Sequence, residues 1–367
     1  MRVAVDATSL LGVQTGVGRV TTQLLEQLAG RGDLEVIAYA ITWRNRQRLA
    51  RVVPSGVRPA TRAFPARLTR VLWPSQRFPS VEHWTGPVDV VHATNYVAPP
   101  AGAAVLVTVF DLTYAHFPEL CDGDALRYPR LVQVAIDRGA TVQTSSDFVA
   151  AEIRDLYGLP EQRVIRVYPG LGPFTVGDPA GGKRCAGADR YILALGTVEP
   201  RKNLPVLVRA FDAIATIDRD ATLVVAGPDG WGVESFDEAL ANAHHRDRVR
   251  RLGWVDERQR RDLLAGATLL AYPSIYEGFG LPPLEAMQAG VPVVASSSGS
   301  LPEVLGDAAL LPDPMSVDSV ADSLRRVLED EELRLALITR GRERARSYRW
   351  ERATDEYVAA YRRVVQR

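Results

Sequence analysis

The sequence predicts an α/β fold made of two doubly wound domains, and three observations support this prediction. At 367 residues the chain is longer than one hydrophobic core usually serves. Short apolar runs alternate with amphipathic stretches along it, which is the pattern of parallel strands covered by helices on both faces. Near the middle, residues 170–189 are rich in glycine and proline and carry no hydrophobic period, which is typical of a connection between domains.

The first domain is expected over residues 1–170. Its first helix is the clearest element, because apolar residues from Val17 to Leu28 recur at helical spacing and Gly30 follows them. Apolar runs bounded by turn residues predict six strands, near residues 2–6, 34–41, 88–92, 104–110, 140–143 and 164–168.

The second domain is expected over residues 190–350, after a linker over 171–189. Two such domains would hold a ligand in a cleft beyond the carboxyl ends of their strands. The charged helices at the end of the chain would cover a sheet edge or cross back, and the last one, 351–367, is expected to pack on the first domain. The predicted strands lie near residues 190–195, 221–226, 248–252, 268–272 and 291–295, and the final helices at about 316–329, 331–347 and 351–366.

Composition narrows the classes of function. The formal net charge is +0, which argues against general nucleic-acid binding. No apolar run approaches the roughly 20 residues of a membrane-spanning helix, and the first residues are typical of a strand rather than a signal peptide. We therefore expect a cytoplasmic protein. Cys121 and Cys185 lie far apart and lack histidines at metal spacing, so neither a disulfide framework nor a zinc site is indicated.

The segment 44–77 is basic, because no acidic residue occurs between Val36 and Val81 while nine arginines and several aromatic residues do. Arginines interleaved with aromatic residues suit an anionic membrane surface or a phosphate-bearing acceptor. A solvated face balanced by acidic residues elsewhere is the alternative interpretation. Peripheral contact with the inner face of a membrane is therefore one expectation for this segment.

A glycine-containing loop, Gly12 to Arg19, follows the first predicted strand and opens the first helix. Backbone N–H groups at Gly16 and Gly18 could hold a pyrophosphate, although a flexible turn is the alternative interpretation. Thr21 stands where a dinucleotide fingerprint requires glycine, and the acidic ribose partner is absent. A nicotinamide-dependent dehydrogenase is therefore the weakest of the enzyme alternatives.

The stretch from Gly196 to Asn203 lies between a predicted strand and a helix and includes the pair Arg201 and Lys202. Two cations beside a helix N-terminus can neutralise a diphosphate without a metal. An exposed, idle pair is the alternative interpretation.

A second strand-to-helix connection runs from Tyr272 to Ala286, and in it Glu277 and Glu285 flank a Gly-Phe-Gly-Leu turn. Two carboxylates at such a turn could bind sugar and ribose hydroxyls. Helix capping or surface exposure is the alternative interpretation of these acids.

These motifs together resemble the family 4 retaining glycosyltransferases, which have the GT-B architecture of two Rossmann-like domains. Glu277 and Glu285, eight positions apart, look like the family's E-x7-E motif, and Glu199-Pro200-Arg201-Lys202-Asn203 is similar to its donor-phosphate signature. The resemblance covers essentially the whole chain. Further similar stretches are Gly16 to Arg19, Phe110 to Tyr114, Leu252 to Val255, Leu301 to Asp307 and Trp350 to Ala353.

The resemblance implies a role for each matching residue. Arg201 and Lys202 would bind the donor diphosphate, Glu277 the transferred sugar and Glu285 the ribose, while Gly16 and Gly18 would close over the phosphates from the other domain. Sugar transfer would proceed with retention, through an oxocarbenium-like transition state whose leaving diphosphate the two cations stabilise. The backbone at Gly253 and Trp254 would meet the base, and the donor site would also include Gly196, Gly278, Phe279, Gly280 and Leu281.

One position departs from the family pattern, because Phe110 stands where many relatives carry histidine near the reacting sugar. His116 could reach the cleft in its place, and Asp111 is a second catalytic candidate beside it. His92 and Asn95, after a predicted strand, are the candidates for the acceptor side.

Two Asp-x-Asp patterns, at Asp122 and at Asp218, are typical of metal-binding transferases of another fold. Their context instead predicts turn and capping roles. We therefore expect no metal and no other cofactor, since the nucleotide-sugar is a substrate.

The function that these observations predict is transfer of a hexose from a nucleotide-sugar to a saccharide, lipid-linked or natural-product acceptor, with GDP-mannose as the predicted donor and mannose as the predicted sugar. A nucleotide-sugar epimerase or a phosphorylase-like enzyme on the same fold is one alternative. A catalytically silent sugar- or nucleotide-binding protein, suggested by Phe110, is another.

Overall fold

A computed structural model describes residues 1–12, 16–43, 45–64, 68, 72–73 and 78–367. The chain forms two compact domains. The N-terminal domain comprises Met1–Gly172 together with Tyr348–Arg367, and the C-terminal domain comprises Pro173–Ser347. None of the helices in the described part of the chain is long and apolar enough to cross a membrane.

The N-terminal domain is built on a seven-stranded parallel sheet with the order β3-β2-β1-β4-β5-β6-β7. The order reverses between β1 and β4, as in other doubly wound sheets. Its strands are β1 (Arg2–Asp6), β2 (Glu35–Tyr39), β3 (Arg58–Ala60), β4 (Val90–Ala93), β5 (Ala104–Val109), β6 (Thr141–Thr144) and β7 (Val164–Arg166). Its helices are α1 (Gly16–Ala29), α2 (Arg46–Val52), α4 (Glu82–Thr85), α5 (Thr113–His116), α6 (Tyr128–Asp137), α7 (Asp147–Tyr157) and α16 (Trp350–Val365).

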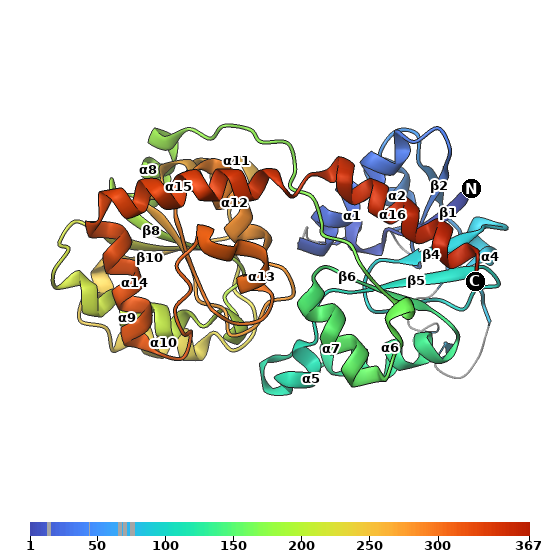
Figure 1. The fold of residues 1–367 in the computed structure, drawn as a ribbon, viewed down its shortest axis with the longest axis horizontal. Helices are drawn as coiled ribbons and strands as arrows, with labels where there is room; N and C mark the ends of the chain where they lie inside the picture. The colour runs from blue at the N-terminus through green and yellow to red at the C-terminus, as the bar shows by residue number, and fades with distance from the viewer. Residues whose placement is uncertain (13–15, 44, 65–67, 69–71, 74–77) are drawn as a thin grey trace. The chain divides into compact units, whose positions relative to one another are not determined.

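The C-terminal domain has a five-stranded parallel sheet with the order β10-β9-β8-β11-β12. Figure 1 shows α9, α10 and α14 on one face of this sheet and α8, α11 and α12 on the other. Its strands are β8 (Tyr191–Leu195), β9 (Thr222–Ala226), β10 (Val249–Gly253), β11 (Leu269–Tyr272) and β12 (Val293–Ala295). Its helices are α8 (Pro179–Ala186), α9 (Leu204–Ala215), α10 (Glu234–Ala241), α11 (Glu257–Gly266), α12 (Leu281–Ala289), α13 (Leu301–Leu305), α14 (Val317–Glu329) and α15 (Glu331–Arg346).

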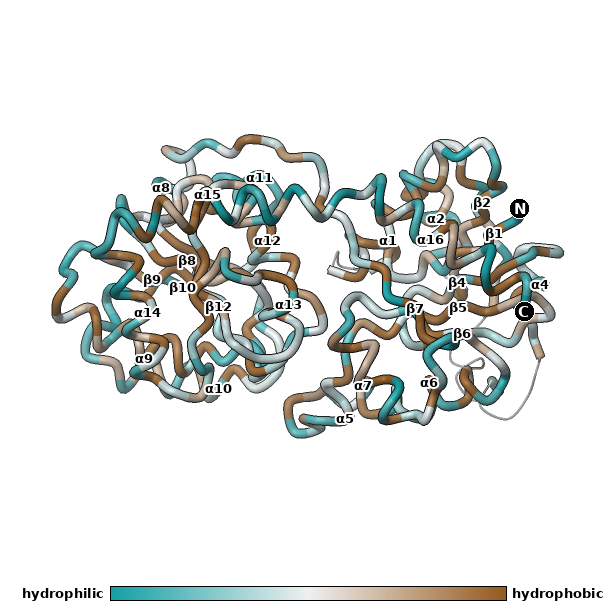
Figure 2. The backbone as a smooth tube through the Cα atoms, in the orientation of Figure 1, coloured by the Kyte–Doolittle hydropathy of each residue, from teal (hydrophilic) through white to brown (hydrophobic). Residues whose placement is uncertain are grey.

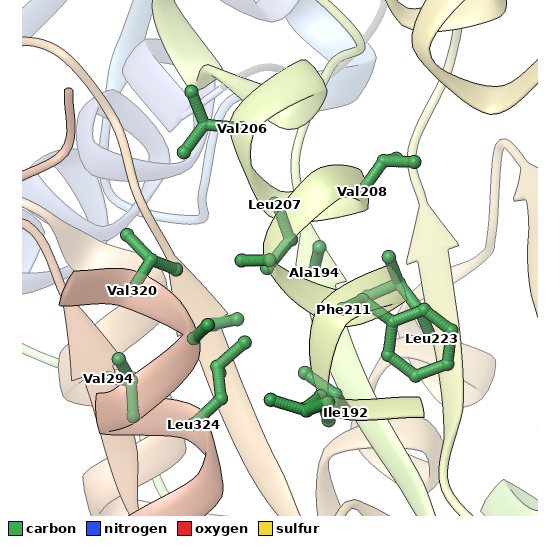
Figure 3. Close-up of a cluster of buried hydrophobic side chains, with 14 of the residues drawn as sticks. Ile192, Ala194, Val206, Leu207, Val208, Phe211, Leu223, Val294, Val320 and Leu324 are labelled. Atoms are coloured by element: carbon green, nitrogen blue, oxygen red, sulfur yellow. The ribbon is translucent and has the colours of Figure 1, made fainter. Parts of the chain in front are cut away.

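Hydrophobic residues concentrate in the strands of both sheets, while hydrophobic and hydrophilic residues alternate along the helices (Figure 2). In the C-terminal domain, Phe211 of α9 and Leu324 of α14 pack on Ile192 and Leu223 of the sheet, and all four side chains are fully buried (Figure 3). The charged helix α14 therefore covers a face of the sheet, where the sequence predicted that it would cover an edge or cross back. Its charged residues are exposed or half-buried.

The predicted linker over residues 171–189 differs most from the structure, because α8 lies within it. Asp178 caps this helix by accepting a hydrogen bond from the Ala180 N–H at 3.0 Å, and Gly187 ends it in the left-handed conformation. The glycines that suggested a flexible connection permit close packing: a Cβ at Gly182 would overlap the backbone carbonyl of Asp262 on α11. The C-terminal domain consequently begins before residue 190.

Two further elements complete the comparison with the predicted elements. The sequence pattern missed β3, a three-residue strand that contains Pro59. It lies at the edge of the sheet, where proline is tolerated. Helix α16 belongs to the N-terminal domain, where it contacts α1, β4 and β5. Residues 13–15 of the glycine loop and residues 44, 65–67, 69–71 and 74–77 of the basic segment lie outside the described residues.

Candidate functional site

Both predicted donor motifs lie at one edge of the C-terminal sheet. The strand order reverses between β8 and β11, and doubly wound sheets bind ligands beyond the carboxyl ends of the strands at such a switch point. Residues 196–203 follow β8, and residues 273–280 follow β11. The topology therefore brings together two loops that are distant in the sequence.

Arg201 and Lys202 lie on a 3-10 turn, η5 (Pro200–Lys202), immediately before α9. The next residue, Asn203, adopts the left-handed conformation with φ 55° and donates its side-chain amide to the Pro314 carbonyl at 2.7 Å. The Ile275 N–H donates to the Arg201 carbonyl at 2.9 Å, which ties the two loops together. The cations therefore precede the helix and are fixed through their backbone.

The side chains of the two loops form a buried cluster of four charges. Glu277 Oε1 lies 2.8 Å from Arg201 Nη1 and 2.6 Å from Lys202 Nζ. Arg201 uses its other guanidinium nitrogen, Nη2, to contact Glu199 Oε1 at 2.7 Å. Lys202 Nζ also donates to the Tyr272 hydroxyl at 2.6 Å. Two acids and two bases thus balance one another, with Glu199 and Glu277 only 8% and 7% exposed.

The protonation states in this cluster follow from burial and charge. Burial by itself would raise the pKa of Glu277, but the charges of Arg201 and Lys202 outweigh it and lower the pKa to about 2. Burial lowers the pKa of Lys202, and the charges of Glu277 and Glu199 oppose that change. Glu277 is therefore ionised at neutral pH, and its negative charge favours the protonated ammonium of Lys202.

The backbone around Glu277 is held by a neighbouring loop. The Ser300 N–H and hydroxyl both donate to the Glu277 carbonyl, at 2.9 and 3.0 Å. Gly280, with φ 97°, is the residue before α12, and Phe279 is buried. Gly278 is likewise buried and Leu281 is half-buried. The turn that presents Glu277 is consequently rigid, with its backbone N–H groups near the start of α12.

Glu285 lies one turn into α12 and contacts a different cation. Its carboxylate pairs with Arg260 of α11, and its side chain is 15% exposed. The structure therefore brings Glu277 to Arg201 and Lys202 but holds Glu285 in a second ion pair. Its predicted contact with ribose stays a prediction.

The other predicted donor residues of this domain follow β8 and β10. A Cβ at Gly196 would lie 3.4 Å from Lys202 Cε, so a side chain at this position would press against the lysine stem. Gly253 ends β10 with φ 69°, and its carbonyl accepts a hydrogen bond from the Gly227 N–H at 2.8 Å. Trp254 is 64% exposed. An exposed aromatic side chain at a strand end is available to a ligand.

The candidate residues in the N-terminal domain are more scattered. Gly16 is exposed and Gly18 buried in the first turn of α1. Asp111 Oδ1 accepts hydrogen bonds from the N–H and hydroxyl of Thr113, at 3.0 and 2.8 Å, which is a turn-capping role. His116 Nε2 lies 3.0 Å from Glu152 Oε1 on α7. Asn95 follows β4 and is half-buried.

The structure corrects the prediction for His92, which does not line an acceptor surface. The residue is 1% exposed, and its ring nitrogens lie 2.8 Å from the Tyr361 hydroxyl and 2.9 Å from the Thr108 hydroxyl. Burial lowers its pKa to about 3, so the ring is neutral. A strand in a parallel sheet is covered on both faces, and here α16 covers the face that carries His92.

Both Asp-x-Asp patterns have the turn roles that their context predicted. Asp122 accepts from the Ala125 N–H at 2.8 Å, and Asp218 accepts from the Asp220 and Ala221 N–H groups at 3.1 and 3.0 Å. Across the described ranges, no three His, Cys, Asp or Glu side chains gather into a metal-binding group.

Sequence reasoning assigned no role to two members of the charge cluster, Glu199 and Tyr272. Both were part of the quoted motifs, but glutamate before proline is typical of a turn and tyrosine at a strand end is typical of a core. The signal that could have identified them is their position, because each lies at the carboxyl end of a strand that borders the switch point.

The chain matches known families and proteins over most of its length. Residues 14–172 match the family Glycosyltransferase Family 4, and residues 183–344 match the family Glycosyl transferases group 1. O-antigen chain mannosyltransferase B of Escherichia coli is 31% identical over 74% of each chain. D-inositol 3-phosphate glycosyltransferase of Actinosynnema mirum is 32% identical over 76% of this chain and 73% of its own.

Solved structures share the whole fold. Sucrose-phosphate synthase from Thermosynechococcus elongatus has a TM-score of 0.76 at 20% identity and covers 99% of each chain. HepE from Anabaena, in complex with UDP and glucose, has a TM-score of 0.73 at 16% identity, over 98% of this chain and 99% of its own. At these identities the likeness concerns the fold alone.

Proposed function

Because the chain belongs to the family 4 (group 1) glycosyltransferases and has their GT-B fold, we propose that it is a retaining, metal-independent hexosyltransferase. The proposed donor is GDP-mannose, and the acceptor is a saccharide, a lipid-linked sugar or a natural product. The observation that supports this proposal most is the buried cluster of Arg201, Lys202 and Glu277 at the switch point of the C-terminal sheet.

The cluster fits the charge changes of sugar transfer. As the bond between sugar and diphosphate breaks, negative charge grows on the leaving phosphate, and preorganised cations stabilise it without solvent reorganisation. Arg201 and Lys202 are held in place by backbone and side-chain contacts within the C-terminal domain. Cationic N–H donors beside a helix N-terminus can bind a diphosphate without a metal, which is the reason for proposing a metal-independent reaction.

Glu277 would bind the transferred hexose. Both cations contact the same carboxylate oxygen of Glu277, Oε1. An ionised carboxylate accepts hydrogen bonds from sugar hydroxyls. Glu285 would bind the ribose, and the backbone at Gly253 and Trp254 would meet the base.

Mannose is proposed as the sugar because the relative at 31% identity is named as a mannosyltransferase. The complex of HepE with UDP and glucose makes UDP-glucose the competing donor. Thermal unfolding with GDP, UDP, dTDP, ADP and NAD in the presence of EDTA separates these possibilities, because a ligand that binds only the folded state raises its apparent stability. Selective stabilisation by GDP supports the proposal, and stabilisation by NAD alone contradicts it.

The proposed stereochemistry has its own test. Incubation with the matching nucleotide-sugar and a set of saccharide acceptors, followed by NMR of the product, gives the anomeric configuration. A product with the configuration of the donor supports retention, and an inverted product contradicts it.

A second candidate function is a catalytically silent sugar- or nucleotide-binding protein, and Phe110 favours it. This side chain packs against the hydrophobic cluster of the N-terminal domain, at the position where the family resemblance leads us to expect a histidine. Tight donor binding without transfer to any acceptor would support this candidate. Conversion of the donor without an acceptor would instead support the epimerase or phosphorylase-like alternative.

The basic segment 44–77 is proposed to contact an anionic membrane surface at the cytoplasmic face. Trp43 and Phe78, at its two ends, are 58% and 67% exposed, and large exposed aromatic residues beside arginines suit a lipid headgroup region. Binding to anionic vesicles that weakens with salt supports this contact. Equal binding to neutral and anionic vesicles contradicts it.

A further inference from the structure

Tyr272, the last residue of β11, contacts the cation that follows the neighbouring strand β8. Its side chain is 3% exposed, and its hydroxyl lies 2.6 Å from Lys202 Nζ. The ammonium also lies 4.6 Å from the centre of the tyrosine ring, within the range of a cation–π interaction. An aromatic residue that looks like part of the core therefore holds a charged residue of the candidate donor site.

The hydroxyl acts as an acceptor toward Lys202. An ammonium has three N–H donors and no acceptor, so the tyrosine oxygen must accept from it. Burial, together with the negative charge of Glu277, raises the pKa of Tyr272 well above its ordinary value. The hydroxyl is thus neutral whenever Lys202 is charged.

Two of the three N–H donors of Lys202 have partners within the described part of the chain. Tyr272 accepts one, and Glu277 Oε1 accepts another, each at 2.6 Å. Because an ammonium is tetrahedral, two fixed hydrogen bonds determine the direction of the third donor. The lysine stem is confined as well, since a Cβ at Gly196 would already lie 3.4 Å from Cε. Lys202, Gly196, Tyr272 and Ser274 line one pocket.

We propose that Tyr272 is a positioning residue of the donor site: with Glu277, its hydroxyl orients Lys202 so that one N–H of the ammonium remains directed at the donor diphosphate. This inference rests on the proposed function, because it assigns the ligand of Lys202. Tyr272 touches no substrate in this proposal and acts through the lysine. The cation it holds is one of the two that are proposed to stabilise the leaving diphosphate.

The test compares Tyr272→Phe with Tyr191→Phe. Tyr191 lies on β8 of the same sheet and is fully buried, and its hydroxyl donates to the Leu263 carbonyl at 2.6 Å. Each substitution removes one buried hydroxyl and keeps the ring, so the two variants should lose similar stability. Only Tyr272→Phe removes a contact to Lys202. Thermal unfolding of both variants checks their folding, and all binding is measured well below the lower transition.

The expected result is that Tyr272→Phe weakens binding of the preferred nucleoside diphosphate and lowers kcat/KM of transfer, each by about tenfold, as for loss of a hydrogen bond to a charged group. Tyr191→Phe should bind and turn over like the unmodified protein. Equal behaviour of the two variants, with the unmodified protein active, overturns the role of Tyr272 and leaves the proposed function in place.

The pH dependence of nucleoside-diphosphate binding provides a second measurement. A purely structural role of Tyr272 would leave this pH dependence unchanged. Lys202 faces Glu277, Glu199, Arg201 and the Tyr272 hydroxyl, and removal of this hydroxyl takes away an acceptor that favours the charged ammonium. The pKa of Lys202 should fall, so the loss of diphosphate binding at alkaline pH should begin at lower pH in Tyr272→Phe. An unchanged alkaline limb contradicts the proposal. Absence of binding to GDP, UDP, dTDP and ADP by the unmodified protein would overturn this inference together with the proposed function.

Discussion

Replacing Glu277 by glutamine tests the charge cluster through stability alone. The structure lowers the pKa of Glu277 from 4.5 to about 2. At about 1.4 kcal/mol for each pH unit, the ionised carboxylate contributes about 3 kcal/mol to folding. Because the pKa is lowered on folding, this contribution is fully present above pH 4.5 and is lost as the pH falls toward 2. Glu277→Gln removes it and leaves the charges of Arg201 and Lys202 without their shared partner.

The assay is urea unfolding of the unmodified protein and Glu277→Gln, followed by circular dichroism between neutral pH and about pH 3. Other carboxylates also titrate between neutral pH and about pH 3, but they do so in the unmodified protein and in Glu277→Gln alike. The difference between the free energies of unfolding of these two proteins therefore reports on Glu277. The control is Glu329→Gln. Glu329 forms an exposed pair with Arg325, and such pairs contribute about 0–1 kcal/mol.

The expected difference between the unmodified protein and Glu277→Gln is about 3 kcal/mol at neutral pH, and it should shrink steadily below pH 4.5. The reasoning would be refuted by a difference that stays constant with pH, or by one no larger than that of Glu329→Gln. Either result would mean that Glu277 is not held ionised by the two cations.

Three further predictions concern other parts of the molecule. Lys202→Ala should abolish transfer while the fold remains intact by circular dichroism, because the leaving diphosphate loses a buried cation; full activity would contradict the site assignment. Gly182→Ala should lower the melting temperature, since its Cβ would overlap the Asp262 carbonyl, whereas Gly16→Ala, in open space, should not; equal effects would argue against close packing of α8 on α11. His92 has a pKa lowered to about 3, so the unfolded chain binds a proton that the folded one does not and stability should fall as the pH drops from about 6.5. His92→Gln should remove that part of the pH dependence, and an unchanged profile would show that His92 titrates in the folded state.

The strands and the motif-bearing loops were predictable because their signals are local. Apolar runs and flanking turn residues define a strand within a few residues of itself. Of the twelve strands in the described part of the chain, eleven overlap a predicted range, and only β3 does not. The same holds for α12, where Pro282 and Pro283 follow Gly280 at the helix start. The fold class and the family were confirmed on this basis.

The predictions for Gly182 and His92 were wrong for the same reason, because the environment of each residue is formed by residues far away in the sequence. The glycines of residues 171–189, Gly182 among them, indicated a linker between domains. In the structure a Cβ at Gly182 would overlap the Asp262 carbonyl of α11, which lies far along the chain. The sequence predicted that His92 lies on the acceptor side. In the structure its ring contacts the hydroxyl of Tyr361, which belongs to α16 at the other end of the chain. Neither partner is visible in a window of neighbouring residues.

By itself the sequence determined the two-domain α/β fold, the family, and the two loops that carry Arg201, Lys202 and Glu277. It could do so because hydrophobic periodicity and turn-forming residues are recognisable within a short stretch of neighbouring residues. Only the tertiary structure decided that Arg201 and Lys202 contact the same carboxylate oxygen of Glu277. It also decided that Glu199 pairs with Arg201, that Tyr272 accepts from Lys202, and that Glu285 pairs with Arg260. The physical reason is that ion pairing and burial depend on which strands become neighbours. Here the reversal of strand order places β8 beside β11.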